Sequence, residues 1–118
     1  MTESVGVVEK SYEFSLVIVQ LCLELPKNSV GYAISSQLVR SGTSIGANIE
    51  EAQDAMSRAD FAKCMSISLK EARETKYWLR LLGDSKMVEG KVANKALEKL
   101  GHIIRMLTKI VKTVKSGS

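Results

Sequence analysis

Apolar residues recur with unusual regularity near the C-terminal end of the chain. Successive members of this series are separated alternately by four and three residues: Ala93, Leu97, Leu100, Ile104, Leu107, Val111 and Val114. This spacing aligns them on one side of a helix and is typical of the seam along which helices pack in a bundle. The chain must therefore supply further helices that cover this seam.

The rest of the sequence also favours helices. Pro26 is the only proline, and strand-like alternation of apolar and polar residues is scarce. We predict helices over residues 7–25, 30–56, 58–82 and 86–115. Their ends are indicated by Pro26 with Asn28, by a capping Ser57, and by Gly83. The short connections favour antiparallel neighbours, so we expect an all-α, antiparallel up-and-down four-helix bundle in one domain, residues 1–118.

The middle of the second predicted helix is rich in small and polar residues. We interpret residues 41–48 as helix, because the apolar period continues in phase across them. Gly42 and Gly46 would then allow another helix to approach closely, at a cost of about 1 kcal/mol each relative to alanine.

The first predicted helix carries two apolar stripes. One consists of Tyr12, Leu16, Val19 and Leu23, and the other of Phe14, Ile18, Leu21 and Leu25. They lie about 200° apart on the helix, whereas a helix of a lone bundle needs only one. We assign the Phe14 stripe, with Trp78, to an interface between subunits, because large apolar and aromatic side chains dominate such contacts.

Charged residues in the second and third helices indicate their register. A turn near Ser57 pairs residues whose numbers add to about 114. This register predicts two structural ion pairs, Arg40 with Glu74 and Glu51 with Lys63.

The basic character of the protein lies in its last third. The net charge is +4, yet residues 84–118 hold eight Lys or Arg against three Asp or Glu. Seven of the basic side chains fall within an arc of about 140° on the last helix. They are Lys91, Lys95, Lys99, His102, Arg105, Lys109 and Lys112, and Glu98 is the one acid among them. This basic face predicts contact with a nucleic-acid backbone, with a simple solvated face as the alternative.

Other functions find little support in the sequence. Gly42-Thr43-Ser44 lacks the Gly-Lys-Ser/Thr of a phosphate loop, and the carboxylates lack the Glu-x-x-His pattern of bundles that hold metals. We therefore expect no enzyme activity, no catalytic residues, no cofactor and no metal. Cys22 and Cys64 are expected as buried, reduced thiols of a cytoplasmic protein. We expect no membrane segment either, because the apolar run 14–25 is too short.

Two stretches of the sequence match the signature of a known family. They are residues 36–52 (SQLVRSGTSIGANIEEA) and residues 60–79, with Asp60-Phe61, Met65–Thr75 and Trp78-Leu79. The chain resembles the four helix bundle proteins, also called 23S rRNA-intervening sequence proteins. The resemblance implies a left-handed bundle assembled as a ring-shaped homopentamer. Such proteins are encoded within insertions in large-subunit ribosomal RNA genes or stand alone. They are similar to the accessory protein of diversity-generating retroelements, which binds nucleic acid and a reverse transcriptase.

Two functional hypotheses follow from these observations. The first is a non-enzymatic, homo-oligomeric protein that binds nucleic acid, RNA in preference to DNA, through the basic face of the last helix. The second is a homo-oligomeric adaptor that binds another protein and has no role with nucleic acid.

Overall fold

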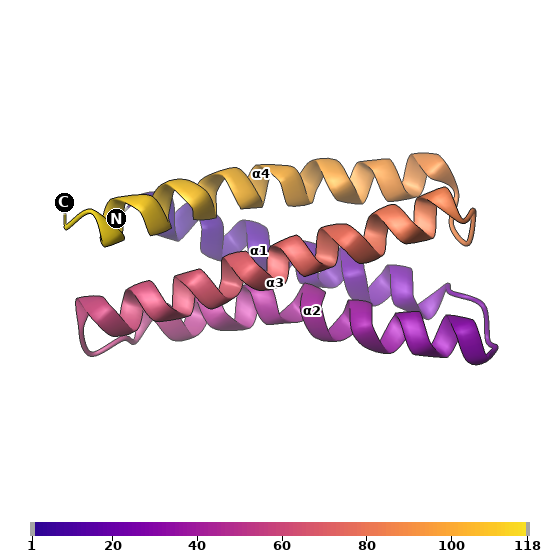
Figure 1. Ribbon diagram of the computed structural model, residues 1–118, viewed down its shortest axis with the longest axis horizontal. Helices are drawn as coiled ribbons and strands as arrows, with labels where there is room; N and C mark the ends of the chain where they lie inside the picture. The colour runs from indigo at the N-terminus through magenta and orange to yellow at the C-terminus, as the bar shows by residue number, and fades with distance from the viewer. Residues whose placement is uncertain (1, 118) are drawn as a thin grey trace.

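The computed structural model describes residues 2–117 of the chain, with side chains from residue 6 onward. It contains four α-helices and, within that range, no strand. The helices are α1 (Thr2–Leu23), α2 (Ser29–Gln53), α3 (Arg58–Asp84) and α4 (Gly90–Lys115). Each helix contacts the next, and α1 also contacts α4. Figure 1 shows the connections at alternate ends of the molecule, with both termini at the same end. The all-α prediction is confirmed.

Local capping explains where two of the helices begin. The Asn28 side chain accepts a hydrogen bond from the Gly31 amide at 2.9 Å and caps α2. Ser57 caps α3 as predicted, because its hydroxyl accepts a hydrogen bond from the Asp60 amide at 3.0 Å. The second helix ends at Gln53, three residues before its predicted end. Met56, at the predicted end of this helix, consequently lies outside it and is 92% exposed.

The connection between α3 and α4 differs from the prediction. Gly83 does not end α3 but lies inside it, where a Cβ would be only 2.9 Å from the Cβ of Ala93. The left-handed residue that ends the helix is Lys86, with φ of 63°, and the Met87 amide donates to the Leu82 carbonyl across it. Because this turn occupies residues after Asp84, α4 begins at Gly90 rather than at residue 86.

The small residues of α2 form the contact with α1. Residues 41–48 are helical, as predicted. A Cβ at Gly42 would lie 2.8 Å from Cγ2 of Ile18, and one at Gly46 would lie 3.3 Å from the Ser11 carbonyl oxygen. The two glycines therefore let α1 lie close against α2.

The structure reverses our assignment of the two stripes on α1, which begins at residue 2 rather than 7. Phe14, Ile18, Leu21 and Leu25 are buried in the core of the chain itself. The other stripe faces outward, with Tyr12 57%, Leu16 51% and Leu23 60% exposed. The Phe14 stripe cannot be the interface between subunits, because its side chains already fill the space between the four helices.

Polar contacts fix α2 against α3 in the predicted register. The buried Thr75 hydroxyl donates to the Ser41 hydroxyl at 2.9 Å, and the Ser68 hydroxyl donates to the Ile45 carbonyl at 2.8 Å. Both pairs fit a sum near 114. Arg40 forms the predicted ion pair with Glu74.

The second predicted ion pair is wrong. Glu51 and Lys63 form no ion pair with any described side chain, and both are exposed to solvent. They lie toward the end of the α2–α3 hairpin, where each charge is free to remain hydrated.

Candidate nucleic-acid interface

The basic face of α4 is exposed along its whole length. The side of α4 that faces the core holds Ala93, Ala96, Leu100, Ile103, Leu107, Ile110 and Val111. The opposite side carries the seven predicted basic residues, and all of them are exposed to solvent: Lys91, Lys95, Lys99, His102, Arg105, Lys109 and Lys112. The amphipathic pattern of this helix thus separates the core from a line of positive charge.

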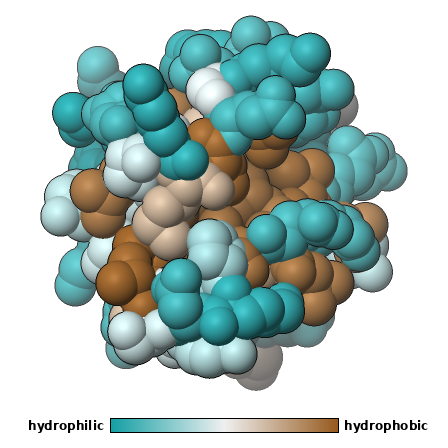
Figure 2. Space-filling view, turned by 90° about the vertical axis from the view of Figure 1, so that its right-hand side faces the viewer, coloured by the Kyte–Doolittle hydropathy of each residue, from teal (hydrophilic) through white to brown (hydrophobic). Residues whose placement is uncertain are grey.

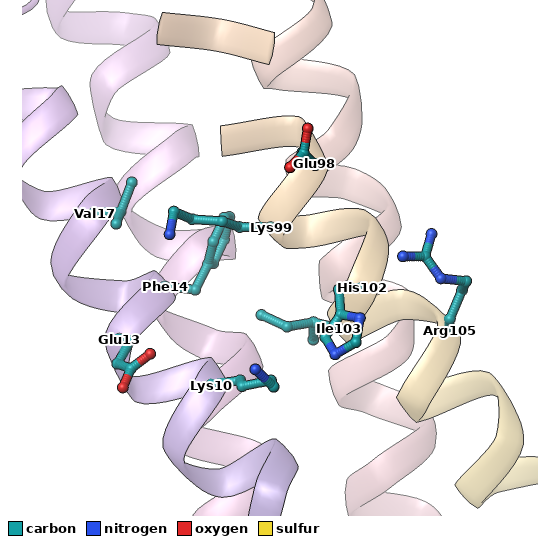
Figure 3. A pocket seen from close by; sticks show the side chains of 9 residues that line it. All are labelled: Lys10, Glu13, Phe14, Val17, Glu98, Lys99, His102, Ile103 and Arg105. Carbon is teal, nitrogen blue, oxygen red and sulfur yellow. The ribbon is translucent and has the colours of Figure 1, made fainter. Parts of the chain in front are cut away.

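A groove of about 350 Å³ separates this face from α1. In Figure 3, Lys99 reaches from α4 toward α1, whereas Arg105, which also lines the groove, extends its side chain away from α1. The groove also contains two carboxylates, Glu13 and Glu98, and one further cation, Lys10. Because both positive and negative side chains line this groove, it has only a weak preference for an anion.

A second groove lies between α4 and α3 and was not foreseen from the sequence. Lys76 and Arg80 of α3 line it together with Gly101 and Arg105 of α4. The spacing of the two α3 cations, four residues apart, does place them on one face of that helix. Sequence reasoning missed them because only the packing of α3 against α4 brings them beside Arg105.

A cluster of polar side chains around Arg40, on the other edge of α3, holds helices of the chain together. The Arg40 guanidinium contacts Oε1 of Glu71 at 3.2 Å and also pairs with Glu74, whose Oε2 accepts the indole N–H of Trp78 at 3.1 Å. The hydrogen bond from Arg40, followed by that from Trp78, holds the pKa of Glu74 below its ordinary value. The hydrogen bond to Glu74 likewise raises the pKa of Arg40. The charge of Arg40 is compensated within the chain, so this cluster stabilises the α2–α3 contact.

Trp78 is half buried and packs against the core of its own chain, with the Tyr77 ring 5.0 Å away in an edge-to-face arrangement. Its indole N–H is already bonded to Glu74. A role for Trp78 between subunits stays a prediction.

Among the described side chains, the outward stripe of α1 is the longest line of exposed apolar residues on one helix. It consists of Tyr12, Leu16, Val19 and Leu23. Figure 2 shows a further gathering of hydrophobic side chains at the end of the molecule where α1 connects to α2 and α3 to α4. Contiguous apolar surface of this kind is typical of contact with another protein surface.

The remaining side-chain chemistry is sparse. Cys22 and Cys64 are free and half buried, rather than fully buried as expected. Burial raises the pKa of the Cys22 thiol, which opposes formation of a reactive thiolate. No three His, Cys, Asp or Glu side chains of residues 6–117 gather around a possible metal position. None of the four described helices has the length and apolarity needed to cross a bilayer.

Known proteins support the resemblance seen in the sequence. The sequence profile of 23S rRNA-intervening sequence proteins matches residues 3–109. A solved structure of a protein of unknown function from the S23 ribosomal protein family of Bacteroides thetaiotaomicron is 41% identical, with a TM-score of 0.87. That similarity covers 93% of this chain and 98% of the other. No curated protein shows significant similarity to the chain.

Proposed function

Because the chain belongs to the 23S rRNA-intervening sequence protein family, we propose that it is a non-enzymatic RNA-binding protein. In this proposal it is an antiparallel up-and-down bundle that binds the RNA backbone through the exposed basic face of α4. The observation that carries the proposal is the position of that face. Its seven basic side chains lie opposite the core and are exposed from Lys91 to Lys112.

The dimensions and chemistry of this face suit a nucleic-acid backbone. From Lys91 to Lys112 the helix rises about 30 Å, which spans several phosphate groups along a strand. No Phe, Trp or Tyr occurs between Lys91 and Lys112, and Glu98 is the one acid within this face. Binding through such a face comes mainly from contacts with phosphates and release of counterions, and it is steeply dependent on salt.

Self-association would multiply this basic face. We propose that the outward stripe of α1, with Tyr12, Leu16 and Leu23 more than half exposed, packs against another copy of the chain. Burial of each large apolar side chain in such a contact contributes about 1.5–3 kcal/mol. The family resemblance suggests a ring of five subunits, in which five basic faces would act together on one RNA.

Reversal of charge on α4 tests the proposal. The variant with Lys95, Lys99, Arg105 and Lys109 all changed to glutamate should lose measurable binding to a structured RNA at moderate salt. A fluorescence-anisotropy titration measures this loss, and duplex DNA of equal length tests the preference for RNA. Light scattering should show the same mass for the variant and the wild type.

A control variant tests whether binding depends on where the charges lie or only on the net charge of the protein. It reverses four exposed basic residues that line neither groove of α4, namely Lys27, Lys63, Lys70 and Arg73. Both variants lower the net charge equally, but the control should keep most of the affinity. Equal losses in the two variants, or no binding by the wild type, would contradict the proposal.

The second candidate is an adaptor function that uses the apolar surface instead. The exposed α1 stripe and the hydrophobic end of the molecule in Figure 2 favour it. The partner would be another protein, such as the reverse transcriptase suggested by the similarity to retroelement accessory proteins. Binding of that protein would change little with salt and would be lost on substitution of Leu16 rather than of the α4 cations.

A further inference from the structure

The groove between α3 and α4 brings three cations together, and no carboxylate lines it. Its walls carry Lys76 and Arg80 from α3 and Arg105 from α4, and its volume is about 400 Å³. None of its lining residues is an acid. Among the side chains that the structure describes, residues 6–117, none of these three takes part in an ion pair.

On the opposite edge of α3, a cation that stabilises the fold is paired with carboxylates. There Arg40 faces two carboxylates, Glu71 and Glu74, and its charge is compensated inside the chain. The three cations of the α3/α4 groove have no such compensation. Like charges held close together repel each other, and an anion placed between them relieves that repulsion. The groove therefore has the electrostatics of an anion site rather than of a structural contact.

The residues at the base of the groove leave space for an anion between the three cations. Leu97, Leu100 and Ile104 form its apolar base, with Gly101 among them. Because Gly101 has no side chain, nothing projects from that position between the cations of the two helices. A Cβ there would lie 3.5 Å from Nη1 of Arg105, which is an ordinary contact distance. Arg105 therefore passes directly over the glycine, and a small side chain would fit beneath it.

We propose that this groove binds a backbone phosphate of the RNA that the basic face of α4 attracts, so that the interface extends from α4 onto α3. This inference rests on the proposed function. The two arginines can present paired N–H groups to phosphate oxygens, while Lys76 adds a third charge. The lining residues include no aromatic ring and no side-chain amide, so the groove contacts the backbone and not the bases.

A single pair of substitutions at Gly101 tests the groove without removal of any cation. Gly101→Asp places a carboxylate among Lys76, Arg80 and Arg105 and occupies the anion site from within. Gly101→Asn has nearly the same size and helix propensity but no charge, and is the matched control. Affinity for a fluorescent RNA hairpin should fall about tenfold in the aspartate variant relative to the asparagine variant. The dependence of log K on log salt should become shallower by about 1, as expected for one lost phosphate contact.

This experiment distinguishes a wrong assignment of the groove from a wrong assignment of RNA binding to the α4 face. If the aspartate and asparagine variants bind equally while the α4 charge reversal abolishes binding, the groove is not a phosphate site and the proposed function stands. If the wild type itself does not bind RNA, both are wrong. Light scattering and circular dichroism of each variant exclude a loss of assembly or helix as the cause of weaker binding.

Discussion

Among single residues, Glu74 makes two side-chain contacts although its side chain is only partly buried. It pairs with Arg40 from α2 and accepts the indole N–H of Trp78 from its own helix. Glu71 lies one turn away and shares the same guanidinium. Arg40 thus holds two carboxylates that would otherwise repel each other. This cluster connects α2 to α3 where the sequence predicted an ion pair.

The lowered pKa of Glu74 predicts a specific dependence of stability on pH. Because the folded-state pKa lies below that of the unfolded chain, the ionised carboxylate stabilises the fold at neutral pH. This contribution is lost as the pH falls from the ordinary value of 4.5 through the lowered folded-state pKa. Wild type should exceed Glu74→Gln in free energy of unfolding by less than about 1 kcal/mol at pH 7. Urea unfolding at fixed protein concentration should show that difference shrink toward zero in acid; a constant difference would refute the assignment.

Among the helices, α2 shows how small residues determine which side of a neighbour packs inward. Gly42 receives Ile18, and Gly46 receives the backbone at Ser11. Ile18 belongs to the buried Phe14 stripe, and Ser11 lies one turn before Phe14 and is also buried. Alanine at Gly42 would place its Cβ 2.8 Å from a branched, buried side chain that cannot move aside.

We expect Gly42→Ala to destabilise the protein by about 1–2 kcal/mol despite the better helix propensity of alanine. Gly101→Ala is the control, because its Cβ meets only a flexible arginine, and it should stabilise the protein by up to about 1 kcal/mol. Thermal or urea unfolding of both variants measures the two changes. Stabilisation by Gly42→Ala would show that α1 does not pack closely against α2.

The helices were predictable from the sequence, but the side that each turns inward was less so. Periodicity identified both apolar stripes of α1, yet it carries no information on which stripe meets the core. A signal was present: the small residues Ser11, Ser15 and Cys22 flank the Phe14 stripe, where a neighbouring helix can come close. Likewise, the seven basic residues of α4 were predicted correctly as exposed. The contribution of Lys76 and Arg80 required the packing of α3 beside α4.

For the whole molecule, the exposed α1 stripe predicts self-association. Leu16→Glu places a charge in the middle of the stripe, where burial against another copy would remove it from water. We expect this variant to lower the mass measured by light scattering while its helical circular dichroism is unchanged. Met56→Glu is the control, because Met56 is exposed away from the stripe. A Leu16→Glu variant with the mass of the wild type would exclude the stripe as the contact between subunits.

The central claim is that the exposed basic face of α4 binds RNA through its phosphates. The most direct test is the affinity of the wild-type protein for a structured RNA, measured from low to moderate salt. We predict a linear fall of log K with log salt, with a slope of several units, because each phosphate contact contributes about 0.7–0.9. Affinity that is independent of salt, or the absence of binding at low salt, would contradict the account.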